Sequence, residues 1–73
     1  MKKITKREAR KAYDNGTPVQ IIPNFANPYH EMWRGCFEKC ELEDMDFDKL
    51  CDNVLYYHQN DGCGRKLAYY VEE

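Results

Sequence analysis

Four cysteines are the residues of this chain with the widest range of chemistry. Cys36, Cys40, Cys51 and Cys63 allow three disulfide pairings, but no apolar secretory segment follows the basic N-terminus, so we expect free thiols in a reducing compartment. Cys36 and Cys40 have the spacing of one pair of zinc ligands, and His58 and Cys63 would complete a tetrahedral site. No second closely spaced pair follows, and Cys51 lies on an apolar helix face. We therefore predict no metal and no cofactor.

Acid–base or nucleophilic catalysis has few candidate residues. The chain contains no serine, and neither of its histidines, His30 and His58, accompanies a known nucleophile, phosphate-loop or metalloprotease motif. Cys51 and His58 share the apolar face of one helix, where a buried thiol behaves as a small hydrophobic group. The sequence therefore predicts a protein that is not an enzyme.

Two amphipathic segments predict the helices of the fold. The first begins after Thr5, whose side chain forms a capping pair with Glu8, and it ends near Gly16, which suits the left-handed conformation that follows a helix. The second spans residues 47–59, where apolar residues recur at the spacing of one helix face, and Asp46 is its N-cap.

Alternating side chains predict the strands. Pro18–Ile22 and Lys66–Val71 alternate between two faces, and Met32–Lys39 is a weaker candidate that also fits a loop. The prediction is one α+β domain over residues 1–73, with two helices packed on a short, mainly antiparallel sheet of two to three strands in the order α-β-β-α-β. The strands that flank the second helix could instead run parallel through a right-handed crossover.

Size and composition restrict the classes of function. A chain of 73 residues forms one domain with a small core, which argues against a large enclosed active site. Apolar residues make up 42% and charged residues 33%, as in a soluble globular protein, and no apolar run approaches the roughly 18 residues of a membrane span. We expect a cytoplasmic protein without a membrane partner.

Charge is distributed unevenly along the chain. The formal net charge is −2, yet residues 1–11 carry six basic side chains and one acid. A basic first helix attracts phosphate, so a small nucleic-acid-binding module is the alternative function, and a solvated helix face is the simpler interpretation of the same charges. The residues that would bind nucleic acid are Lys3, Lys6, Arg7, Arg10 and Lys11.

An aromatic loop and the acidic segment after it form the leading candidate for a contact surface. Aromatic side chains in a polar loop either fold back to close a small core or mark a contact surface, and binding residues are common on loops held by a rigid scaffold. The residues predicted to bind a partner are Phe25, Tyr29, His30, Trp33, Glu41, Glu43 and Asp44.

Both ends of the chain also carry a family resemblance. Residues Ile4–Tyr13 with Gly16, then Phe47–Leu50, Tyr56–Tyr57 and Tyr69–Glu73, resemble small uncharacterised proteins of phages and mobile elements of Gram-positive bacteria. The resemblance covers roughly half of the chain and concerns scaffold residues. It implies a non-enzymatic protein that binds a host or element-encoded macromolecule, with antagonism of a bacterial defence system as one such role.

Overall fold

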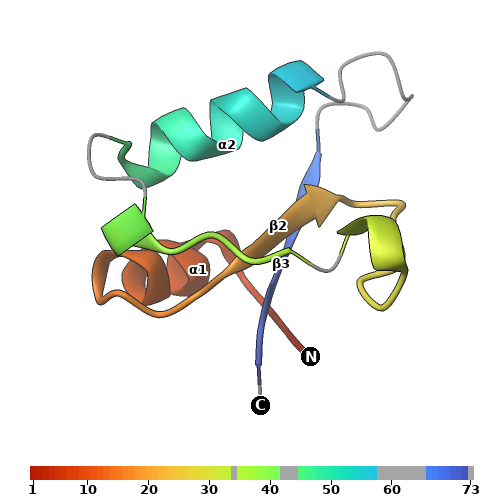
Figure 1. Cartoon of the computed structure of the whole chain (residues 1–73), viewed down its shortest axis with the longest axis horizontal. Coiled ribbons are helices and arrows are strands. Elements are labelled where there is room, and N and C mark those ends of the chain that lie inside the picture. The colour runs from red at the N-terminus through yellow and green to blue at the C-terminus, as the bar shows by residue number, and fades with distance from the viewer. Residues whose placement is uncertain (34, 42–44, 58–65, 73) are drawn as a thin grey trace.

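A three-stranded antiparallel sheet carries both helices on one of its faces (Figure 1). The computed structural model describes residues 1–33, 35–41, 45–57 and 66–72. Along the chain the elements are β1 (Lys2–Ile4), α1 (Lys6–Asp14), β2 (Gln20–Pro23), the 3-10 turns η1 (Glu31–Trp33) and η2 (Lys39–Glu41), α2 (Phe47–Tyr57) and β3 (Leu67–Val71). The predicted α+β class is confirmed, and the predicted order holds apart from the leading strand β1, with an isolated bridge at Phe37 in the place of the second strand predicted between the helices.

The last strand, β3, is the centre of the sheet. The strand order is β1-β3-β2, and both neighbours run antiparallel to β3, with Ile4 and Ile21 each opposite Tyr69. The strands on either side of α2 are therefore antiparallel, and the parallel alternative is wrong. Sequence patterns gave no indication of β1, because its two lysines break the apolar alternation, although charged residues are typical of an edge strand.

The first predicted strand is displaced toward the C-terminus. It was expected over Pro18–Ile22, but Pro23 is the last residue of β2 and pairs with Leu67. Val19 exchanges both backbone hydrogen bonds with Phe37, at 3.0 and 2.8 Å, so its N–H and C=O point away from β3. Pro23 lies four residues after Val19, so its backbone groups have the same orientation in the strand. The N–H group that proline lacks would therefore also point away from β3. A proline is therefore tolerated at this edge.

The candidate strand at Met32–Lys39 is reduced to one bridge. Over the described residues of this stretch, pairing is confined to Phe37 and Val19, and η1 and η2 lie on either side of it. Segment 35–37 consequently lies beside the free edge of β2 without extending the sheet to a full fourth strand.

Local hydrogen bonds set the helix ends as the sequence predicts. The Thr5 hydroxyl accepts from the Glu8 N–H while the Glu8 carboxylate accepts from the Thr5 N–H, each at 3.1 Å. Gly16 follows α1 with φ +85°, a conformation that favours glycine. Before α2, the Asp46 carboxylate accepts from the Lys49 N–H at 2.8 Å, which confirms the second N-cap.

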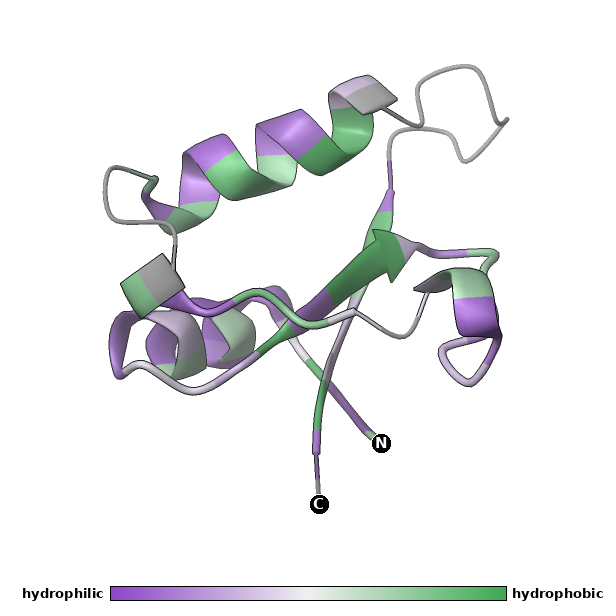
Figure 2. Cartoon of the chain, viewed as in Figure 1, coloured by the Kyte–Doolittle hydropathy of each residue, from purple (hydrophilic) through white to green (hydrophobic). Residues whose placement is uncertain are grey.

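An aromatic cluster joins the two helices to the sheet. Phe47 of α2 lies 6.0 Å from the Tyr13 ring of α1 and 5.9 Å from the Tyr69 ring of β3, measured between ring centroids. The Tyr13 hydroxyl donates to the Met45 carbonyl at 2.7 Å, which supplies a partner for its buried polar end. The apolar side of α2 faces the sheet and its polar side faces away (Figure 2).

Arg10 covers the outer side of this cluster. Its guanidinium lies 5.4 Å from the centroid of the Phe47 ring and donates two hydrogen bonds to the Asp48 carboxylate, at 2.7 and 3.1 Å. The hydrogen bonds from Arg10 hold the pKa of Asp48 below its usual value and raise the pKa of Arg10. A basic residue of the first helix is thus tied to the start of the second.

None of the helices in the described part of the chain has the length and apolar character that crossing a bilayer requires.

Replacing Phe47 tests the aromatic cluster. Phe47→Ala should lower the free energy of unfolding by about 3–5 kcal/mol, because it removes a buried ring that three elements share. Denaturant titration followed by circular dichroism measures the loss. The exposed Asp52→Ala on the same helix should change stability by less than about 0.5 kcal/mol, and equal losses in both variants would contradict the assigned role.

Acid titration tests the pair of Arg10 and Asp48. Because folding lowers the pKa of Asp48, its stabilisation is present above the usual pKa of aspartate, about 3.9, and is lost as the pH falls through the folded value. Stability measured from pH 7 down to pH 2 should therefore fall less steeply on the acid side in Asp48→Asn than in wild type. Glu8, whose pKa is lowered mainly by the Thr5 N–H, keeps part of the acid slope in both proteins.

Candidate functional site

The loop of residues 24–33 packs over the face of the sheet opposite the helices. Ile21 of β2 lies in the core under the helices. Because side chains alternate along a strand, the preceding residue, Gln20, points to the opposite face. The Gln20 amide nitrogen Nε2 donates to the carbonyl of Pro28, at 3.0 Å, and to that of Trp33. One fully buried side chain therefore holds the loop at two points five residues apart.

Short-range hydrogen bonds give this loop a defined shape. The Asn27 carboxamide oxygen accepts from the Tyr29 N–H at 2.9 Å, and the Asn27 carbonyl accepts from the His30 N–H at 3.0 Å. His30 Nδ1 accepts from the Met32 N–H at 3.1 Å, and the His30 carbonyl accepts from the Trp33 N–H at 2.9 Å. His30 thus has a structural contact within the loop, and its ring nitrogen Nδ1 is occupied by a backbone donor.

Large apolar side chains of the loop remain exposed although its backbone is tied down. The exposed fractions are 56% for Phe25, 65% for Tyr29 and 72% for Met32, whereas Trp33 is half-buried. The loop therefore closes the back of the sheet mainly through Gln20, and it presents most of its aromatic surface to solvent. Solvent-exposed apolar groups clustered on one loop are a feature of interaction sites.

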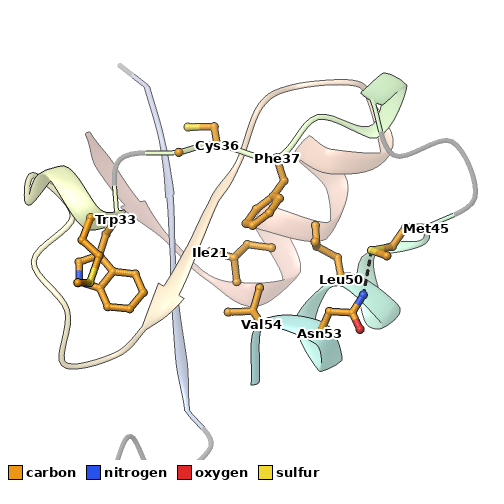
Figure 3. Close-up of a pocket in the computed structure, with 10 residues that line it drawn as sticks. Ile21, Trp33, Cys36, Phe37, Met45, Leu50, Asn53 and Val54 are labelled. Carbon is orange, nitrogen blue, oxygen red and sulfur yellow. Dashed lines mark hydrogen bonds between the residues drawn. The ribbon is translucent and has the colours of Figure 1, made fainter. Parts of the chain in front are cut away.

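A groove opens between α2, the edge of β2 and segment 35–37 (Figure 3). Its volume is about 700 Å³, within the range of ligand-binding pockets. The bridge between Val19 and Phe37 holds one wall against the sheet, while α2 supplies the other. Side chains that line it are Ile21, Met32, Phe37, Met45, Leu50 and Val54, together with the half-buried Trp33. Because Met32 and Trp33 belong to the loop as well, groove and loop form one apolar surface.

The lining of the groove is suited to packing and not to proton transfer. No Asp, Glu, His, Lys or Arg is among the described residues that line it. Asn53 supplies an amide, whose Nδ2 donates to the Met45 sulfur at 3.4 Å. Cys36 supplies a thiol, and desolvation by burial, with smaller effects of Glu72 and Glu38, raises the pKa of this thiol. A thiol with a raised pKa stays protonated near neutral pH and is a poor nucleophile.

The acidic part of the predicted contact surface is only partly described. Glu41 lies in η2, and the structure describes its backbone but not its side chain; Glu43 and Asp44 lie outside the described residues. Of the predicted aromatic set, the structure places Phe25, Tyr29 and His30 on the exposed loop and Trp33 at the groove.

The basic residues of the alternative site lie on two elements. Lys6, Arg7 and Lys11 are exposed on α1, whereas Lys3 lies on β1 opposite Tyr70. Arg10 already binds Asp48, which reduces its availability to a phosphate.

Of the four cysteines considered for a metal site, Cys51 is buried in the core and Cys63 lies outside the described residues. Cys51 is 4% exposed in the core, as its place on the apolar helix face predicts, and its sulfur is 4.0 Å from the Tyr69 hydroxyl. His58 and Cys63 lie outside the described residues. Within the described ranges, no three Cys, His, Asp or Glu side chains are grouped as a metal site requires.

Sequence reasoning missed most of the groove. Met32, Gly35 and Met45 all line it, and none of them was a candidate. The alternation of Trp33, Gly35 and Phe37 was a partial indication, since all three line the cavity, but Cys36 between them lines it too. Their meeting with Met45 and α2 depends on tertiary packing.

The chain matches no family model, no curated protein and no solved structure.

Replacing Gln20 tests how the loop is held. Gln20→Met keeps the length of the side chain but removes both bonds to the loop, so we expect a loss of about 1–3 kcal/mol in unfolding free energy. Amide exchange of His30 and Trp33 should accelerate more than that of α2 residues. Ile22→Val, on the same face of the same strand, is the control, because it removes one methyl group without a loop hydrogen bond. Equal acceleration in both variants would contradict the tether.

Proposed function

We propose that this chain is a non-enzymatic protein-binding module that captures a host or element-encoded protein in the bacterial cytoplasm. Its contact surface is the loop of residues 24–33 together with the groove beside it. Antagonism of a bacterial defence system is the proposed consequence, in line with the resemblance of its scaffold residues to small proteins of phages and mobile elements.

The exposure of three large side chains on a tethered loop carries this proposal. Phe25, Tyr29 and Met32 are each more than half exposed, in a chain whose small size makes every large apolar group valuable to the core. Because the loop is already shaped by its own hydrogen bonds, little conformational entropy is lost when a partner covers it. A preformed apolar surface of this kind favours binding.

The absence of proton-transfer groups among the described groove residues supports a binding function over catalysis. General acid–base catalysis requires a titratable side chain within hydrogen-bond reach of the reacting atoms. The described groove residues offer an amide and a protonated thiol.

Affinity capture from a bacterial lysate tests the proposal. The wild-type protein should retain a specific protein, identified by mass spectrometry, and Phe25→Ser combined with Tyr29→Ser should reduce its recovery by at least about tenfold. The expected loss follows from removing two exposed aromatic anchors. Circular dichroism should show that the double variant stays folded, because both side chains lie outside the core.

Two controls separate this function from its alternatives. Tyr56→Ser removes an aromatic side chain of similar exposure, 68%, from α2 and should leave capture intact. Charge reversal at Lys6 and Lys11 should also leave it intact, whereas a nucleic-acid-binding module would lose its salt-dependent binding. Capture that survives the loop variants, or that disappears on nuclease treatment, would argue against a protein-binding loop.

A further inference from the structure

The groove has an acidic frame. Among the residues of 31–53 whose side chains the structure describes, five are acidic (Glu31, Glu38, Asp46, Asp48 and Asp52) and two are basic (Lys39 and Lys49). Lys39 is paired with Asp14 at 3.8 Å and Asp48 with Arg10 at 2.7 Å, which leaves four acids and one base among them. In the sequence, Glu31, Glu38, Asp46 and Asp52 each directly neighbour a residue that lines the groove, as does Lys49. Besides desolvation by burial, the negative charge of Glu38 also contributes to the raised pKa of the groove thiol of Cys36. The residues next to the apolar lining thus carry an excess of negative charge.

The lining itself favours flexible apolar side chains of a partner. Met32 and Met45 both line the groove, the first from η1 and the second from the residue pair before α2. Methionine is unbranched and polarisable, so it adapts to aliphatic and aromatic side chains of different shapes. A groove with this lining accepts large apolar anchors of a peptide segment.

We propose that the groove binds a cationic segment of the partner protein, in which large aliphatic or aromatic residues are flanked by Lys or Arg. This inference rests on the proposed function and specifies the chemistry of the partner. The apolar anchors fill the groove and displace water, while the basic side chains lie against the acidic frame. Negative charge around the groove disfavours an acidic segment, since like charges brought together at an interface cost free energy.

A second copy of this chain is a poorer occupant. Its basic helix α1 has the required charge, but the apolar residues of that helix, Ala9 and Tyr13, are fully buried in its own core. They could enter the groove of another molecule only if α1 left its core.

Designed peptides test this assignment directly. The probe is a synthetic peptide of alternating leucine and lysine blocks, and its matched controls replace lysine with glutamate or leucine with glutamine. Trp33 is the single tryptophan of the chain and lines the groove, so its emission reports occupancy, and calorimetry provides an independent measurement. The leucine–lysine peptide should bind saturably, at least about tenfold more tightly than either control, and its affinity should fall as salt is raised.

A groove-filling variant links binding to this site. Gly35 lines the groove and a Cβ built on it would meet no atom within 4 Å, so Gly35→Phe adds a ring at the groove without a clash at Cβ. It should weaken peptide binding by at least about tenfold, whereas Thr17→Phe, at an exposed position after α1, should not. Should Gly35→Phe fail to fold, Glu31→Lys combined with Glu38→Lys gives the second test and should weaken the leucine–lysine peptide in the same direction.

The outcomes separate this inference from the proposed function. Saturable binding that depends on leucine, lysine and an open groove supports it. Equal binding of the leucine–glutamate peptide, no binding of any peptide, or a self-associated protein that dissociates in Gly35→Phe would overturn it. If a lysate protein is nevertheless captured through Phe25 and Tyr29, the proposed function stands and the cationic partner is wrong.

Discussion

The placement of Phe47 between both helices and the sheet is the constraint on which the rest of the structure depends. Its ring meets Tyr13 on one side and Tyr69 on the other, and Arg10 lies over it. A chain of 73 residues has few large side chains to bury, so a ring shared by three elements contributes a large part of the core. The ion pair of Arg10 and Asp48 lies at the exposed edge of this cluster. It orients the two helices relative to each other, and because it is exposed it contributes little to the free energy of unfolding.

Gathering both helices on one face leaves the other face of the sheet to be covered by something else. The loop of residues 24–33 takes that position, and Gln20 holds it there by two carbonyls. The Gln20 oxygen Oε1 is buried and has no hydrogen-bond partner among the described residues. Such an arrangement costs free energy, because a buried polar atom has lost its hydration without a full replacement. The two hydrogen bonds that Nε2 donates to the loop carbonyls offset part of that cost.

The groove arises from the same distribution of elements. Phe37 pairs with Val19 at one bridge, and beyond it segment 35–37 stands beside β2 without forming a ladder. Gly35 lines the groove without a side chain, and a Cβ built on it would meet no atom within 4 Å. An apolar cavity therefore remains next to the exposed loop, and several residues that neighbour its lining in the sequence are acidic. The binding proposals follow from this adjacency of apolar surface and negative charge.

Local sequence determined the helices, the caps and the face of β3 that enters the core. Thr5, Glu8 and Asp46 form bonds to residues three positions away, and periodicity assigns each side chain a face, so both are visible within a short window. Only tertiary structure decided the strand β1, the shift of β2 to include Pro23, the tethering of the loop and the groove. These features depend on pairings between residues far apart in the chain, such as Gln20 with Trp33 and Ile4 with Tyr69. Backbone and side-chain groups find such partners only when the core has brought them together.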